Sequence, residues 1–138
     1  GGGNFGAVTM FEFRLHPVGP EVATVNPMFP MAEARSLLDT WRSFTALAPD
    51  EASTAFAIWG VPEHPDMPTE LHGTPICLFD GMYAGSLADG EALFRPLREA
   101  SLPLLDLSGR ASYVEVQTAF DEFMCDGDLY YWKSLFLN

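Results

Sequence analysis

Residues 31–61 read MAEARSLLDTWRSFTALAPDEASTAFAIWGV, and the spacing of their apolar side chains changes partway along. From Met31 to Ala48 apolar residues recur at steps of three and four, which predicts a helix with one apolar stripe. Pro49-Asp50 ends that pattern, and Thr54 to Val61 is then expected to form a strand. The helix residues expected to face the core are Ala34, Leu37, Leu38, Trp41, Phe44 and either Leu47 or Ala48.

The sequence on both sides continues this alternation. Strands are expected at Phe11–His16, Val22–Phe29, Pro75–Tyr83, Leu102–Leu107 and Leu129–Leu137, and helices at Ser86–Ala100 and Tyr113–Phe123. The proline-rich residues 62–74 are expected to form a loop. Two prolines modify the prediction, because Pro27 favours an edge or bulged strand and Pro96 should kink or shorten the second helix.

Between Val22 and Leu107 the expected order is strand, helix, strand, strand, helix, strand. This βαββαβ order predicts an α+β, ferredoxin-like domain, in which an antiparallel sheet carries both helices on one face. Pro75–Tyr83 is apolar almost throughout and is expected to be a central strand, with Cys77 as a small buried hydrophobic residue. The side chains expected between helices and sheet are Leu37, Leu38, Trp41, Phe44, Leu93 and Leu97.

The composition argues against several classes of ligand. The 138 residues include 19 acidic and 7 basic side chains, for a formal net charge of -12. Such a surface repels phosphate backbones and anionic membranes, so no nucleic-acid or membrane binding is expected. No metal site is expected either, since His64 and His72 would need further ligands from Glu63, Asp66 or Glu70.

The glycine cluster GGGNFG at residues 1–6 permits close backbone approach to a ligand, because glycine has no Cβ. The cluster lacks the strand before it and the helix after it that the dinucleotide-binding fingerprint requires. Its continuation, AVT at 7–9 and FEFRLHPV at 11–18, closely resembles the segment that closes the FAD-binding domain of berberine-bridge-type FAD-linked oxidases. Further runs are similar to bacterial members of that family: LLDTWRSFTALAP at 37–49, LHGTP at 71–75, YAG at 83–85, GEALFRPLR at 90–98 and YYWKS at 130–134.

The resemblance implies a two-domain flavoenzyme that oxidises alcohols, sugars or alkaloid-like small molecules, with oxygen as the acceptor. Residues 1–9 would be the closing edge of the FAD-binding domain, and residues 10–138 a truncated substrate-binding domain. The resemblance assigns Tyr131 and Lys133 to substrate binding, and the catalytic base to a segment after Asn138. It assigns FAD contacts to Gly2, Gly3, Asn4, Phe5 and Gly6. Without the missing FAD-binding domain, the chain is expected to bind no FAD and to be inactive.

A second hypothesis stays open from the sequence: a stand-alone ferredoxin-like module that binds a small ligand or self-associates, since this fold serves many functions. As a fragment of the oxidase, the chain is expected to form a homodimer. An uncovered sheet face and an unpaired strand edge favour pairing with another copy, most simply across a two-fold axis.

Overall fold

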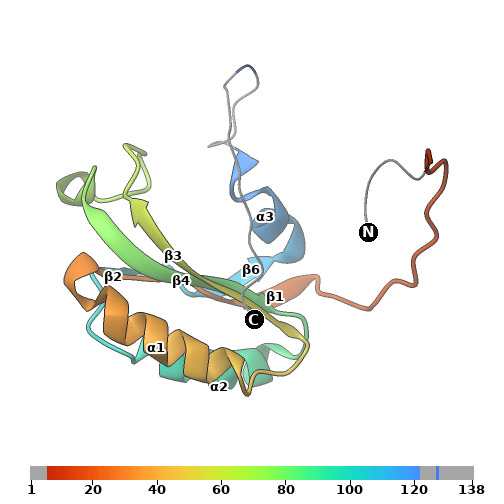
Figure 1. Cartoon of the computed structure of the whole chain (residues 1–138), viewed down its shortest axis with the longest axis horizontal. Coiled ribbons are helices and arrows are strands. Elements are labelled where there is room, and N and C mark those ends of the chain that lie inside the picture. Colours follow the sequence, from red (N-terminus) through yellow and green to blue (C-terminus); the bar gives the residue numbers. More distant parts are fainter. Residues whose placement is uncertain (1–5, 122–126, 128–138) are drawn as a thin grey trace.

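A computed structural model describes residues 6–121 and residue 127, and its centre is one six-stranded antiparallel sheet (Figure 1). The strands are β1 (Glu21–Val25), β2 (Pro27–Pro30), β3 (Ala52–Gly60), β4 (Pro75–Tyr83), β5 (Leu105–Asp106) and β6 (Gly109–Ser112). The helices are α1 (Ala34–Thr45), α2 (Leu87–Arg98) and α3 (Tyr113–Thr118), with short 3-10 turns η1 (Met31–Glu33) and η2 (Thr69–Leu71). The order from β1 to β6 is the predicted α+β, ferredoxin-like arrangement.

Strands β1 and β2 are two segments of one strand line, interrupted at Asn26, and both pair with β4 in the same register. Ala23 pairs with Tyr83 before the interruption and Met28 pairs with Leu78 after it, both on β4. On the other side, β6 pairs with β1 and β5 pairs with β2, so these two strands also form one line. The sheet therefore runs from β3 through β4 and the β1–β2 line to the β5–β6 line.

The structure confirms that Pro75–Tyr83 is a central strand, because β4 pairs with β3 on one side and with β1 and β2 on the other. The expectation of an edge strand around Pro27 is wrong, since β2 lies between β4 and β5. A proline has no N–H for the ladder, and Pro27 falls directly after the interruption at Asn26. There the Asn26 N–H donates to Ser108 Oγ over 2.8 Å, and the Gly109 N–H donates to Thr24 Oγ1 over 3.2 Å.

Helices α1 and α2 both cover one face of the sheet, which we call the helix face, as predicted (Figure 1). The buried core between them comprises Val25, Phe29, Leu37, Cys77, Phe79, Phe94 and Leu97, with Trp41, Phe44 and Leu93 packed against it. Phe79 contacts Phe29 edge-on, with 5.6 Å between ring centroids. Alternate strand residues point to this face because side chains in a strand alternate between the two faces.

Two helix predictions need correction, and a third concerns Pro96. Leu38 lies at the margin of the stripe and is 36% exposed, because it is one helical step beyond the buried Leu37. Helix α1 ends at Thr45, three residues before the expected end, which leaves Leu47 outside the helix and exposed. Pro96, expected to kink or shorten the second helix, lies in the last turn of α2, and α2 ends at Arg98 rather than at the expected Ala100. A proline in the last turn removes one hydrogen bond to residue 92, which lies on the exposed side of the helix.

The opposite face of the sheet, which we call the second face, is covered in two different ways. At one end the loop 61–74 closes it, and a second buried cluster forms from Met28, Val61, Ile76 and Leu78 with Met67 and Leu71. At the other end α3 stands over the sheet, on the side opposite α1 and α2 (Figure 1). α3 is shorter than the predicted helix over Tyr113–Phe123.

Two of the predicted strands, Phe11–His16 and Leu102–Leu107, differ from the structure. Phe11–His16 forms no strand, and its side chains are exposed along a segment that leaves the sheet (Figure 1). Its alternation is that of a strand, but no part of the chain that the structure describes pairs with it. The strand predicted at Leu102–Leu107 begins at Leu105 instead, as β5, and β6 continues its line to Ser112. The strand predicted at Leu129–Leu137 lies outside the described residues.

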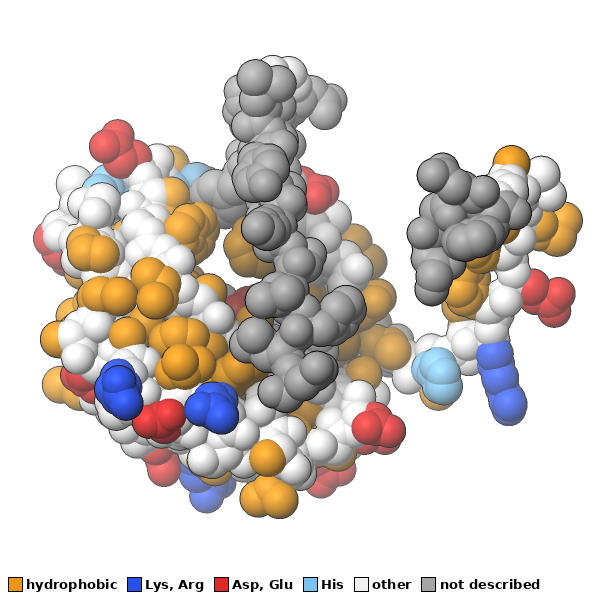
Figure 2. All heavy atoms as spheres, in the orientation of Figure 1, with side chains coloured by type: hydrophobic (Ala, Val, Ile, Leu, Met, Phe, Trp, Pro, Cys, Tyr) orange, Lys and Arg blue, Asp and Glu red, His pale blue; other side chains and the backbone are white. Residues whose placement is uncertain are grey.

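Edge strand β3 pairs with β4 alone among the described residues. Ile58, near the end of β3, is 59% exposed, and Figure 2 shows hydrophobic side chains at the surface in the region of β3 and α1. None of the described helices is long and apolar enough to cross a membrane.

Candidate functional site

A hollow of about 670 Å³ lies on the second face, between the sheet and α3, and we call it the α3 hollow. Its sheet side is lined by Thr24, Asn26, Ser53, Ala55, Asp80, Met82, Leu107 and Ala111. Its other side is lined by Tyr113, Glu115, Val116, Gln117, Ala119 and Phe120. A hollow of this volume, with apolar walls and a few polar groups, has the size and character of a small-molecule site.

The polar centre of the hollow is the pair formed by Asn26 and Asp80. The two residues lie opposite each other across the β1–β2 line and β4, at the point where the ladder is interrupted. Asn26 Nδ2 donates to Asp80 Oδ1 over 2.9 Å. The Asn26 backbone is fixed on its other side by Ser108 Oγ and by the Leu107 N–H, which donates to the Asn26 carbonyl over 3.0 Å. Asn26 therefore holds the Asp80 carboxyl group in one orientation.

The electrostatic environment of Asp80 is unusual for this chain's many acids. Burial raises the pKa of the Asp80 carboxyl above its ordinary value, and the hydrogen bond from Asn26 opposes that shift only in part. No Lys or Arg is among the described residues that line the hollow. In addition, Asn26 Oδ1 is buried and has no hydrogen-bond donor among the described residues. A buried acceptor without a donor is costly and is rare in folded proteins, so it marks a candidate ligand contact.

The wall formed by α3 is anchored by a capping box at its start and by two contacts with more distant parts of the chain. Ser112 and Glu115 form a capping box, in which Ser112 Oγ accepts from the Glu115 N–H and Glu115 Oε2 accepts from the Ser112 N–H. These bonds hold the pKa of the Glu115 carboxyl below its ordinary value. At the helix start, the Tyr113 N–H donates to the Pro20 carbonyl over 2.9 Å. Beyond the helix, the Phe120 ring lies 6.4 Å from the ring of Trp59 on β3.

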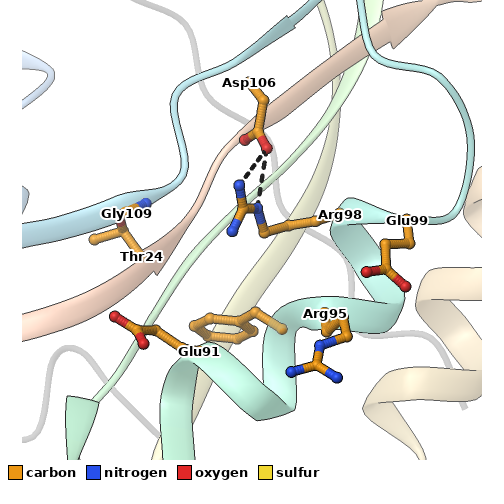
Figure 3. A pocket seen from close by; sticks show the side chains of 8 residues that line it. Thr24, Glu91, Arg95, Arg98, Glu99, Asp106 and Gly109 are labelled. Atoms are coloured by element: carbon orange, nitrogen blue, oxygen red, sulfur yellow. Dashed lines mark hydrogen bonds and ion pairs between the residues drawn. The ribbon is translucent and has the colours of Figure 1, made fainter. Parts of the chain in front are cut away.

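A second hollow, of about 430 Å³, lies on the helix face beside α2 and the edge of the sheet, and Figure 3 shows the side chains around it. Arg98 points at Asp106 and donates to its Oδ2 from Nε and Nη2, over 2.9 and 2.8 Å. Nearby, Arg110 Nε donates to Glu91 over 2.6 Å.

Asp106 illustrates how this second hollow neutralises its own charges. Burial raises the pKa of its carboxyl, but the hydrogen bonds from Ser108 and the Arg98 guanidinium outweigh burial and hold that pKa below its ordinary value. Asp106 and Glu91 each have a cationic partner, and exposed ion pairs of this kind are common on surfaces. We accordingly take the α3 hollow as the candidate site.

Most of the site residues predicted from the sequence lie outside the described residues: Gly2, Gly3, Asn4 and Phe5 at one end, and Tyr131 and Lys133 at the other. Gly6 is described; it is exposed and has a φ of 143°, a conformation that L side chains rarely adopt. His72, considered as a metal ligand, has its Nε2 3.1 Å from the Met67 carbonyl, and no cluster of metal-binding side chains occurs among the described residues.

Sequence reasoning missed Asn26 and Asp80. One signal was available, because Asp80 is the only charged residue in the run PICLFDGMY and shares the face of Ile76, Leu78 and Met82 by period-two spacing. A single acid on the second face of an otherwise apolar central strand is expensive to bury. It therefore indicates a site rather than a core position.

No protein-family model matches the chain. The chain is 26% identical over 104 residues to the uncharacterized FAD-linked oxidoreductase YvdP of Bacillus subtilis (strain 168), which covers 75% of this chain and 21% of that protein. It is 22% identical over 121 residues to the uncharacterized FAD-linked oxidoreductase YgaK of the same strain, covering 88% of this chain and 24% of that protein. The chain thus spans about a fifth to a quarter of the length of these curated relatives. Both distant similarities point to FAD-linked oxidoreductases.

Proposed function

We propose that this chain is the substrate side of a berberine-bridge-type, FAD-dependent oxidase, and that its second face is the surface turned toward the flavin and the substrate. The observation that carries the proposal is the α3 hollow. Its floor holds a half-buried carboxyl group and a buried amide oxygen without a donor, on the face that α1 and α2 leave free. The similarity of most of the chain to two FAD-linked oxidoreductases supports the same assignment.

The described residues of the α3 hollow do not suit the phosphate groups of FAD. A pyrophosphate needs N–H donors or cations around it, whereas the α3 hollow has acceptors at its centre and no Lys or Arg among its described residues. An acceptor-lined floor suits a substrate that donates hydrogen bonds. We therefore assign the phosphate groups to other parts of the intact protein, with the glycine segment at residues 2–6 as the proposed flavin contact from this chain.

Within this proposal the residues of the hollow orient the substrate. FAD, when bound, would accept two electrons from the substrate. Asp80, held by Asn26, would accept a hydrogen bond from the group that loses its proton in the oxidation, and so orient it; the base that takes that proton stays assigned to the segment after Asn138. Tyr113 and Phe120 would cover the apolar part of the substrate and exclude water. Oxygen as the final acceptor is part of the proposal.

The test uses the full reading frame that encodes this chain. We expect the purified protein to show flavin absorbance, and we expect that absorbance to bleach under anaerobic conditions with at least one alcohol, sugar or amine substrate and to return with oxygen. The 138-residue chain alone should be colourless. A full-length protein that purifies without flavin and takes up none when FAD is added would refute the proposal. That result would favour the second candidate, a stand-alone ligand-binding module.

A further inference from the structure

Deepening the proposed function, on which it rests, we infer that the α3 hollow binds an organic cation. The ligand would be a protonated amine attached to an apolar ring or chain, with its ammonium group against the Asp80 carboxyl.

The described lining of the α3 hollow carries negative charge only. The lining residues with a formal charge near neutral pH are Asp80 and Glu115, both negative, and no described lining residue is positive. Asp80 has a single hydrogen-bond partner among the described residues, the neutral amide of Asn26. On the helix face, by contrast, Asp106 has Arg98 beside it and Glu91 has Arg110. Among the described residues that line the α3 hollow, no cation plays that part for Asp80.

A half-buried carboxylate without a counter-charge favours a ligand that supplies one. Removing a charge from water is costly unless it is paired, and a hydrogen bond between two charged groups is about twice as strong as one between neutral groups. A neutral alcohol could donate a hydrogen bond to the carboxylate but would leave its charge unpaired, whereas an ammonium group adds the attraction of the opposite charge. A carboxylate ligand would be repelled by both Asp80 and Glu115. The net charge of -12 adds to the attraction for a cation in the surrounding field.

The walls suit the remainder of such a ligand. Tyr113 and Phe120 line the hollow with aromatic rings, and Met82, Leu107 and Val116 add apolar surface. Aromatic rings attract cations through the negative charge of their faces, within about 6 Å of the ring centre. The volume of about 670 Å³ accommodates a ring-bearing amine.

Asn26 is the positioning residue of the site. Because its Nδ2 group faces the carboxylate, its Oδ1 points away from Asp80 and remains an unpaired acceptor. That oxygen adds a partial negative charge that no described donor offsets. An ammonium group has three N–H donors, so after one of them binds the Asp80 carboxylate the others remain for further acceptors in the hollow.

The experiment titrates the 138-residue chain with three probes of one size: 2-phenylethylamine, 2-phenylethanol and phenylacetate. Binding is followed by two-dimensional NMR of the backbone amides and by calorimetry. We expect the amine to bind about tenfold or more tightly than the alcohol, with shifts at β4 and α3, and phenylacetate to bind least. Equal affinities for the amine and the alcohol would overturn the inference.

Two variants distinguish amine binding at Asp80 from a general attraction of the amine to the negatively charged chain. Asp80→Asn should weaken amine binding by about tenfold or more and bring it to the level of the alcohol. Asp66→Asn removes an acid whose side chain is 87% exposed in the loop, and should leave amine binding unchanged. Circular dichroism of both variants checks that they remain folded. If Asp80→Asn is folded and binds the amine as the natural chain does, the inference is wrong.

The pH dependence gives a further readout. The titratable groups around the hollow among the described residues are Asp80, Glu115 and Tyr113. Amine binding should fall as the pH drops through the pKa of Asp80, which burial raises, so the loss begins at a higher pH than an ordinary aspartate would give. Asn26→Ala should weaken binding and raise that midpoint further, because Asn26 favours the charged carboxylate. An unchanged midpoint in this variant would contradict the positioning role of Asn26.

The two proposals fail in different ways. Amine binding to the chain, combined with a full-length protein that holds no flavin, would leave the cation site standing and reject the oxidase. A flavin-containing full-length protein that neutral alcohols alone reduce, combined with no amine binding, would reject the cation site and leave the oxidase standing.

Discussion

Gly90 tests how closely α2 approaches the sheet. A Cβ added at this position would lie 2.6 Å from the Cβ of Ala23 on β1 and 2.9 Å from the Cβ of Tyr83 on β4. Ordinary carbon–carbon contacts are about 3.5–4.0 Å. Neither Cβ can rotate away, because both are fixed by the strand backbone. Gly90→Ala should therefore force α2 off the sheet by about 1 Å.

Two effects of opposite sign decide the result. Replacing glycine by alanine inside a helix is worth about 1 kcal/mol in favour of the folded state. Overpacking a buried contact costs about 1–3 kcal/mol, and the fixed neighbours place Gly90→Ala at the upper end. We expect a net loss of about 2 kcal/mol in the free energy of unfolding, whereas an uncrowded site would show a gain of about 1 kcal/mol.

The measurement is urea unfolding followed by tryptophan fluorescence and by circular dichroism, whose transitions should coincide. Ala92→Gly, at an exposed position of the same helix, measures the propensity effect alone and should cost about 1 kcal/mol. In the double variant Ala23→Gly with Gly90→Ala, the nearest clash is removed, so the two changes should cost less together than their sum. A more stable Gly90→Ala variant would refute the close approach of α2 to the sheet.

Four further changes probe three other contacts. Thr54→Val removes the acceptor for Trp41 Nε1, which lies 3.1 Å from Thr54 Oγ1, and should lower the free energy of unfolding by about 1 kcal/mol in the same assay. Asp106→Asn addresses acid stability: because the folded-state pKa of Asp106 is lowered, its contribution is present above the unfolded-state pKa and is lost as pH falls through the folded-state value. On acidification, the midpoint of thermal unfolding should fall less for Asp106→Asn than for the natural chain. Arg98→Ala should reduce this fall in the same direction, but more weakly. Ser112→Ala removes the N-cap of α3 and should cost about 1 kcal/mol, seen as faster amide exchange at the start of that helix.

The elements of the βαββαβ core could be predicted from local patterns. A helix buried on one face has apolar residues at steps of three and four, and a strand buried on both faces is an unbroken apolar run. Leu37 and Phe44 mark the buried stripe of α1, and the apolar run of Pro75–Tyr83 indicates a strand covered on both sides. The same logic fails for Phe11–His16. Alternation shows that one face of a segment is suited to burial, but not which partner buries it, and no described residue does.

The candidate site depends on information that is not local. Asp80 could be assigned to a face of β4 by counting, but its partner Asn26 is 54 positions away. Their meeting depends on the strand order and on the shared register of β1 and β2 against β4. Pro27 predicted an edge strand. In the structure it follows an interruption of an interior strand, where the backbone N–H of the neighbouring Asn26 donates to Ser108 Oγ instead of to a strand partner. The residues predicted from the family resemblance, apart from Gly6, lie outside the described part of the chain, and their assignment stays a prediction.

The alternation of β4 also has an evolutionary consequence. Phe79 belongs to the buried core under the helices, while its neighbour Asp80 belongs to the hollow, and the same division separates Tyr83 from Met82. If the α3 hollow is the site, substitutions at Asp80 and Met82 change what the protein recognises, whereas substitutions at Cys77, Phe79 and Tyr83 change whether it folds. Selection can then replace Asp80 and Met82 one at a time, to reach new ligands, while the residues of the core keep the scaffold stable. A library randomised at Ser53, Asp80 and Met82 should retain folded members far more often than one randomised at Cys77, Phe79 and Tyr83.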